Sequence, residues 1–247
     1  MTLFLMGIVN LLVGVCVGLT GIAGFLLPMF YTGFLGMPSS EALALSFAAF
    51  LVSGVAGSVN YYKSGNLDLK AAGILSAGSF VGAVAGVKLN LLIPEETVKT
   101  ILYLVVLLSG ISILLRKEKK EEKEKKERKG AGLYLILGIV TGAVCAASGA
   151  GGPVLVMPLL TLIGFPAHMA VGISLFDSIF IAMPAAAGYL YHVSSNKEIF
   201  FILPVILIAH GIGVIFGSKN ATKIDQKMLK RIVAVASIVI AGIKLLL

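Results

Sequence analysis

The stretches Thr20-Gly21-Ile22-Ala23-Gly24 and Ser148-Gly149-Ala150-Gly151-Gly152 decide the fold of this chain. They interrupt two apolar runs, Leu3 to Leu35 and Gly132 to Phe165, each of which would measure about 50 Å as one straight helix. A bilayer has a hydrocarbon core of only about 30 Å. Because glycine weakens a helix, we expect each run to break or turn back at these residues. Such non-helical backbone is tolerated at membrane depth only inside the protein or beside a wet cavity.

Composition places the chain in a membrane. Of its 247 residues, 58% are hydrophobic and 13% are charged, with a mean hydropathy of +1.01, whereas soluble domains carry roughly 25% charged residues. Nine of the twenty basic and five of the twelve acidic residues lie within residues 116–129. Basic residues at the ends of apolar runs are typical of cytoplasmic loops, so we expect a lipid bilayer as partner and no nucleic acid.

Six further apolar runs are each long enough for one membrane helix, which needs about 20 residues. They are residues 41–62, 71–92, 97–115, 168–192, 199–217 and 228–246. We therefore predict an all-α polytopic membrane protein of about eight transmembrane segments in two homologous four-segment halves, each opening with a glycine/proline-broken or re-entrant helix. The predicted units are a first repeat at 1–115, a charged cytoplasmic linker at 116–130 and a second repeat at 131–247. Tyr61, Tyr62, Tyr189 and Tyr191 are interpreted as interfacial anchors.

Internal repetition supports this division. At an offset of 128 residues, small and hydroxyl-bearing positions coincide: Gly14 with Gly142, Thr20 with Ser148, Gly21 with Gly149, Gly24 with Gly152, and Ser46 with Ser174. After a three-residue shift, Gly82-x-x-x-Gly86 falls on Gly213-x-x-x-Gly217, a spacing that favours close helix packing. Pro28 and Pro158 are displaced by two residues, so the shape of the break is expected to differ between halves.

Charge distribution favours inverted halves. If each half crosses the membrane four times, thirteen basic residues are cytoplasmic and seven are outside. If each broken segment instead doubles back, sixteen are cytoplasmic and four are outside, namely Lys88, Lys99, Lys197 and Lys244. The second arrangement obeys the positive-inside rule better, and it puts both termini outside. Parallel halves stay open as the alternative.

One part of the second half resembles a known family. Gly142, Ser148-Gly149-x-Gly151-Gly152 and Pro158, followed by Gly164-Phe165-Pro166 and Gly172-Ile173-Ser174-Leu175, resemble the sulfite exporter TauE/SafE family of membrane permeases. The resemblance covers nearly the whole chain. It implies a plasma-membrane transporter of small sulfur anions such as sulfite or sulfoacetate, and not an enzyme. The first half departs from the pattern, with Ala23 opposite Gly151 and Phe25 opposite Pro153.

The two breaks are the candidate site for a small anionic substrate. Exposed backbone N–H groups and the positive end of a half-helix attract an anion, and no arginine lies in the interior of a predicted span, since Arg231 stands near the start of residues 228–246. The candidate substrate-binding residues are Thr20, Gly21, Gly24, Ser46, Ser148, Gly149, Gly151, Gly152 and Ser174. The alternative for the glycines is close helix packing.

Asp177 is the one acidic residue in the interior of a predicted span, and because an intramembrane carboxylate is costly, it indicates a function by default. We interpret it as a candidate for proton or ion coupling, with His210 as a second candidate. A structural acid and a core histidine are the alternatives. The histidines and cysteines are scattered, so no metal or cofactor is expected. A proton-coupled permease for another small solute or a metal ion is the alternative function, and the sequence does not settle the oligomeric state.

Overall fold

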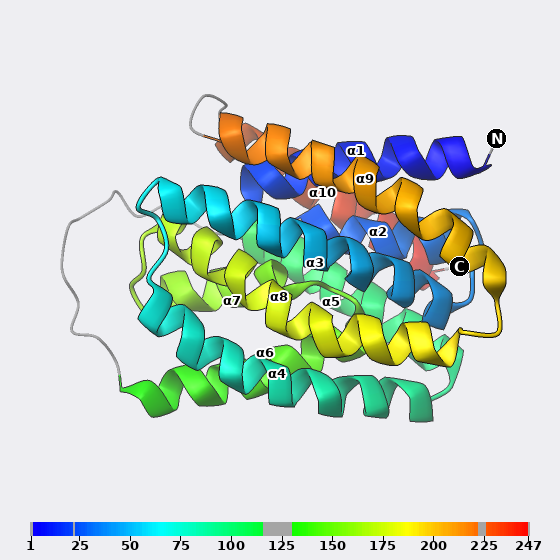
Figure 1. Ribbon diagram of the computed structural model, residues 1–247, viewed down its shortest axis with the longest axis horizontal. Coiled ribbons are helices and arrows are strands. Elements are labelled where there is room, and N and C mark those ends of the chain that lie inside the picture. The colour runs from blue at the N-terminus through cyan, green and yellow to red at the C-terminus, as the bar shows by residue number, and fades with distance from the viewer. Residues whose placement is uncertain (1, 22, 116–129, 222–225, 247) are drawn as a thin grey trace.

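The computed structural model describes residues 2–21, 23–115, 130–221 and 226–246, and all regular elements in these ranges are helical (Figure 1). The first part contains α1 (Thr2–Thr20), the 3-10 helix η1 (Ala23–Phe25), α2 (Leu26–Met29), the π-helix η2 (Phe30–Phe34), α3 (Ser39–Lys63), α4 (Leu69–Leu92) and α5 (Glu95–Leu115). The second part contains α6 (Ala131–Ser148), α7 (Gly152–Leu162), α8 (Ala167–His192), α9 (Lys197–Asn220) and α10 (Gln226–Leu246). The charged linker predicted at 116–130 lies outside the described residues, except for Gly130.

The six single spans predicted from the sequence coincide with helices α3, α4, α5, α8, α9 and α10. By length and apolar composition, α1, α3, α4, α6, α8 and α9 are each able to cross a membrane. The chain is therefore an all-helical, multi-pass membrane protein.

Both long apolar runs break at the predicted glycines, and they do so in the same way. Helix α1 ends at Thr20 and α6 ends at Ser148. The next residue, Gly21 or Gly149, has a φ of 75°. The N–H of Gly21 donates to the Val17 carbonyl at 2.7 Å, and that of Gly149 donates to the Cys145 carbonyl at 2.8 Å. This left-handed cap ends a helix with one satisfied carbonyl, and glycine adopts it without a steric penalty.

The segments after the two caps differ in shape, as the displaced prolines predicted. In the first half, 3-10, α and π turns follow one another from Ala23 to Phe34. In the second half, Gly151 begins one regular helix, α7, with Pro153 in its first turn. Proline suits that position because its missing N–H would have no partner inside the helix.

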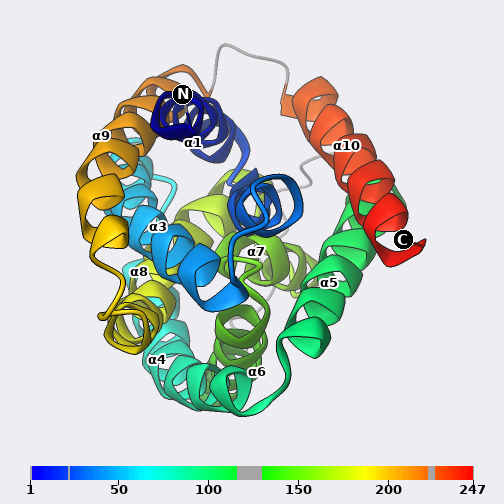
Figure 2. The ribbon, with the colours of Figure 1, turned by 90° about the vertical axis from the view of Figure 1, so that its right-hand side faces the viewer.

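The long helices form a ring around the short ones. Viewed along the long axis, α2 and α7 lie in the centre of the bundle (Figure 2). In the ring, α1 packs on α9, α4 on α6, α3 on α8, and α5 on α10. The N- and C-termini lie at the same end of the molecule (Figure 1). The irregular backbone is thus enclosed by protein, as a membrane requires.

Glycines set the close approach of two helix pairs. A Cβ on Gly82 or Gly86 of α4 would overlap the backbone carbonyl of Ile139 or Ala143 in α6. In the equivalent pair, Gly213 and Gly217 of α9 lie against the backbone of α1 in the same manner. The packing interpretation of both Gly-x-x-x-Gly segments is confirmed.

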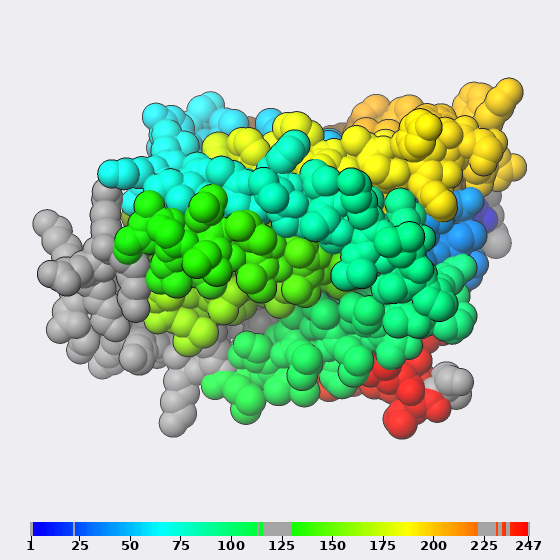
Figure 3. All heavy atoms as spheres, turned by 90° about the horizontal axis from the view of Figure 1, so that it is seen from below, coloured from blue at the N-terminus to red at the C-terminus, as the bar shows by residue number. Residues whose placement is uncertain are grey.

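The outer surface is apolar. Helices α4 and α6 lie side by side on one face (Figure 3), and they expose large side chains such as Val81, Leu89 and Ile136. Of the four tyrosines predicted as anchors, Tyr62 and Tyr191 are exposed, but Tyr61 and Tyr189 are 5% and 0% exposed. The anchor prediction is wrong for these two, because they lie on the inward faces of α3 and α8 rather than on the surface.

Candidate functional site

A narrow cavity lies where the two breaks meet. Gly21 and Gly24 line it from the first break, and Ala150, Gly151 and Pro153 line it from the second. The remaining lining residues are Val17, Phe50, Ser53, Val154 and Ser178. The space is about 10 Å³, which is room for about one water molecule. In this conformation the two breaks leave only this small volume between them.

The polarity of this cavity comes from backbone and hydroxyl groups. None of the ten residues that line it carries a charge. Gly24 and Val154 belong to the first turns of the two short helical segments, and the Val154 N–H makes only a long hydrogen bond, 3.4 Å, to the carbonyl of the N-cap residue Gly151. Both turns therefore present partial positive charge to one shared space.

The structure brings some of the predicted glycines together at this cavity and places others beside it. Gly21, Gly24 and Gly151 line the space. Gly149 packs against Leu43, and a Cβ on Gly152 would lie 3.1 Å from the Ser178 hydroxyl. The two glycines that do not line the cavity thus shape the backbone around it.

The four predicted hydroxyl groups are buried and turned toward their own helices. Thr20 Oγ1 donates to the Cys16 carbonyl at 2.8 Å, and Ser148 Oγ donates to the Val144 carbonyl at 2.7 Å. Ser46 Oγ and Ser174 Oγ donate at 2.7 Å to the carbonyls of residues 42 and 170. None of the four lines the cavity. Their protons would reach an anion only after a change of rotamer.

Sequence reasoning missed Phe50, Ser53 and Ser178. Their signal was helical spacing: Phe50 and Ser53 follow Ser46 by four and seven residues, so they share its face of α3. Ser178 follows Ser174 by four residues on α8. One helical turn beyond each predicted serine thus leads to the cavity.

Asp177 lies on α8 beside the second break, with 0% of its surface exposed. Ser76 and Ser79 of α4 are close enough to its carboxylate to act on it. Neither carboxylate oxygen and neither hydroxyl has a partner of hydrogen-bond geometry. The buried Ser46 and Ser174, by contrast, bond to their own helices. A buried carboxylate without a hydrogen-bond partner is costly to keep charged, so Asp177 is the least satisfied acidic group among the described residues.

One side chain connects Asp177 to the break. Cys145 of α6 is close enough to Asp177 for the carboxylate charge to act on it. The Cys145 thiol in turn donates to the Gly151 carbonyl at 3.4 Å. A change of charge at Asp177 would therefore act on Cys145, whose thiol is bonded to the backbone that lines the cavity.

His210 has a different set of neighbours. It is buried on α9, with Nδ1 3.2 Å from the Asn10 carbonyl of α1. Its Nε2 has no hydrogen-bond partner, and no contact that the described residues make joins it to Asp177. The two candidates for coupling thus occupy separate helix interfaces, α8 with α4 and α9 with α1.

The fold and the site define a multi-pass membrane protein with a small uncharged cavity where two broken helices meet, which is the design of a membrane transporter. The chain belongs to the sulfite exporter TauE/SafE family, which matches residues 3–245. The family resemblance noted in the sequence is therefore confirmed.

Two relatives agree with this family. The probable membrane transporter protein YdhB of Bacillus subtilis (strain 168) is 26% identical over 250 residues, which cover 100% of this chain and 98% of the relative. The probable membrane transporter protein MJ0441 of Methanocaldococcus jannaschii is 24% identical over 233 residues, or 90% of this chain and 85% of the relative. No solved structure matches the chain at a significant level. These names describe transporters, not enzymes.

Substituting Gly151→Ala tests whether the second break has a functional role beyond its backbone strain. Gly151 has a φ of 74°, and so does Gly65 in the turn between α3 and α4, where a Cβ would meet nothing within 4 Å. Alanine at a positive φ costs about 1–3 kcal/mol, and the ψ of 146° at Gly151 is a conformation essentially restricted to glycine, so its cost there is at least as large as at Gly65. We expect Gly151→Ala to lower thermal stability in detergent at least as much as Gly65→Ala, and only Gly151→Ala to lose transport in membrane vesicles that hold equal amounts of folded protein. Equal transport by the two variants would contradict a role for this break.

Proposed function

We propose that this protein carries a small oxyanion of sulfur, such as sulfite or a short sulfonate, through the cavity between its two breaks. The observation that carries the proposal is the convergence of two short-helix beginnings on one uncharged space. A site built only from cationic side chains would bind a lone anion strongly and release it slowly. A site built from backbone N–H groups suits a transporter, which must bind and let go.

The energetics fit a weak, reversible site. A helix N-terminus stabilises an anion by about 0.3–1 kcal/mol when exposed and up to about 2 kcal/mol when partly buried. Two such ends acting on one anion give a moderate total, and the hydroxyls of Ser53 and Ser178 beside them add to it only after a change of rotamer, because they donate here to the carbonyls of Phe50 and Ser174. The sulfur chemistry is suggested by the name of the family, sulfite exporter TauE/SafE.

We propose that eight segments form two inverted halves, residues 1–115 and 131–247. Such an inverted repeat provides a mechanism for alternating access. The packing is consistent with it, because exchanging the halves maps the pair α1 and α9 onto α6 and α4. The equivalent helices α3 and α8 run antiparallel, since Gly57 meets Leu175 while Gly172 meets Asn66. Rocking one half against the other would open the cavity to each side in turn.

The orientation in this proposal places the linker on the cytoplasmic side of a plasma membrane and both termini on the outer side. It is supported by charge, since sixteen of the twenty basic residues then face the cytoplasm. It is also supported by geometry, because the two termini share one end of the molecule (Figure 1). The end of α3 at Lys63, the start of α4 beside Lys70 and the end of α9 beside Lys219 lie at the opposite end of the molecule (Figure 1).

Asp177 is the coupling residue in this proposal, and it favours a second candidate function as well. Its buried position against Ser76 and Ser79 suits uptake of a proton or another cation during each cycle. The same device would serve a proton-coupled permease for a different small solute. His210 is the secondary coupling candidate, because its Nε2 is buried without a partner.

Transport assays in membrane vesicles test the substrate and the coupling together. We expect labelled sulfite, thiosulfate or a short sulfonate to move, and an imposed pH gradient to change the initial rate. Asp177→Asn keeps the shape of the side chain but removes its charge, so we expect it to reduce the effect of the gradient by at least about fivefold.

Asp68→Asn is the matched control for this assay. Asp68 caps α4 by accepting from the N–H groups of Lys70 and Ala71, and asparagine caps a helix equally well. Its transport should equal that of the unmodified protein. If no small sulfur anion moves or binds, the substrate proposal fails. If Asp177→Asn responds to the gradient like the unmodified protein, the coupling role fails.

Reporter fusions test the orientation. An enzyme that is active only outside the cytoplasm, fused after Leu247, should be active, whereas the same enzyme inserted within residues 116–129 should be inactive. A fluorescent protein that folds only in the cytoplasm should give the opposite pattern. Cytoplasmic signals at both positions would rule out inverted halves and favour the parallel arrangement.

A further inference from the structure

The ring of Phe50 occupies the gap between the two breaks. It comes from α3, is 3% exposed and, among the described residues, is the one aromatic side chain that lines the cavity. A Cβ on Gly24 would lie 2.9 Å from its Cε1, and a Cβ on Gly151 would lie 3.4 Å from its Cε2. One edge of the ring thus faces the first break and the other edge faces the second.

The contact with Phe50 explains why residue 24 is a glycine, which its backbone conformation does not require. Gly21, Gly149 and Gly151 have positive φ, but Gly24 does not. A Cβ at position 24 would approach the ring more closely than side-chain packing allows. Glycine at position 24 therefore makes room for Phe50.

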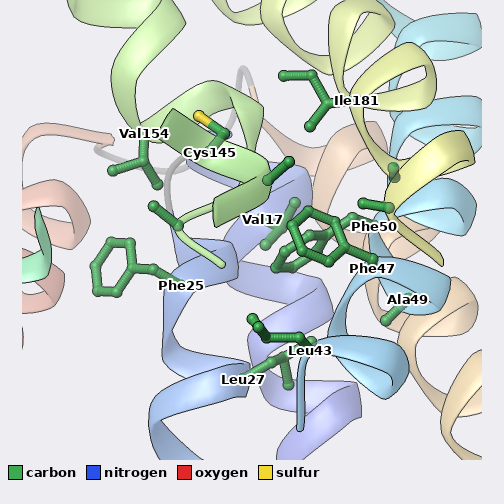
Figure 4. Close-up of a cluster of buried hydrophobic side chains, with 14 of the residues drawn as sticks. Val17, Phe25, Leu27, Leu43, Phe47, Ala49, Phe50, Cys145, Val154 and Ile181 are labelled. Carbon is green, nitrogen blue, oxygen red and sulfur yellow. The ribbon is translucent and has the colours of Figure 1, made fainter. Parts of the chain in front are cut away.

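Other aromatic groups hold the ring in place. The ring of Phe47 packs edge-on against Phe50, with centroids 5.5 Å apart, and the two lie together in the buried cluster (Figure 4). Phe47 stacks on Tyr189 of α8 at 5.8 Å. The Tyr189 hydroxyl donates to the Ala146 carbonyl of α6 at 2.8 Å, two residues before that helix breaks. The position of the ring is thus linked to the end of α6.

The volume of the cavity shows what the ring does. The space beside Phe50 has room for about one water molecule, whereas sulfite has four heavy atoms and a sulfonate has more. An anion can occupy the gap only if something withdraws, and the ring is the largest side chain there. A side-chain rotation needs less rearrangement than moving either break, whose backbone is fixed by its cap.

We propose that Phe50 is the internal plug of the transport site: its ring closes the gap between the breaks in this conformation and must leave it for an anion to enter. The size of the residue at position 50 then sets the size of the anions that pass. This inference rests on the proposed function for its cargo, but the plug itself is testable without transport.

Thiol accessibility tests the plug. In a full-length chain with Cys16 and Cys145 replaced by alanine, Ser178→Cys places one thiol at the cavity. We expect it to react slowly with a membrane-impermeant methanethiosulfonate reagent that carries a sulfonate group. Adding Phe50→Ala should raise the reaction rate at least about tenfold, since reactivity follows the population with an open gap. Phe50→Leu should give a smaller rise.

Phe180→Ala is the matched control, because it removes the same ring from α8, where Phe180 packs on Phe176 rather than lining the cavity. Its reaction rate should stay within about twofold of the parent. If neither Phe50→Ala nor Phe50→Leu reacts faster than the parent, the plug proposal is overturned. Phe50→Leu keeps the test valid if the alanine variant fails to fold. Faster labelling of the Phe50→Ala variant than of the parent, together with no transport of any sulfur anion, would instead support the plug and count against the proposed substrate.

Discussion

The structure depends on one constraint: inside a bilayer, a backbone N–H or carbonyl group must find its partner within the protein. Each break leaves such groups without a helical partner, and the fold supplies partners both from the same helix and from distant side chains. Glycine caps satisfy one carbonyl at each helix end, and the Tyr189 hydroxyl and Asn90 amide reach the carbonyls of residues 146 and 147. The breaks therefore have to lie in the centre of the bundle, and the glycine-lined helix pairs keep the surrounding ring tight. The polar backbone left at the centre is what makes a site possible.

Much of this fold follows from sequence, because its signals are local. Apolar run lengths predict the single spans, and the glycine stretches predict the break points to the residue. The cavity depends on contacts between distant segments, so Phe50 escaped notice as an ordinary core residue. Tyr61 and Tyr189 were misplaced for a related reason: distance along the chain from a span end does not reveal which face of the helix points inward. The sequence likewise identified Asp177, but its neighbours Ser76 and Ser79 lie about a hundred residues away.

The two halves that the sequence pattern relates differ in the chemistry around their breaks. The Tyr189 hydroxyl satisfies a carbonyl of α6, whereas the equivalent Tyr61 hydroxyl has no hydrogen-bond partner. Asp177 has Ala49 at its equivalent position, and His210 stands where the first half has Ser79. The second break begins a regular helix, while the first continues through π turns. Both halves contain a glycine cap, but among the described residues the buried acid beside a break belongs to the second half.

The location of a bound anion tests the account most directly. Selenite has the shape and charge of sulfite, and its selenium atom can be placed by anomalous X-ray scattering from crystals of the full chain. The account predicts one selenium site between the two breaks, within reach of the first-turn N–H groups of Gly24 and Gly152, with the Phe50 ring displaced. Selenium bound only at surface lysines, or between other helices, would contradict the claim that the paired breaks form the transport site.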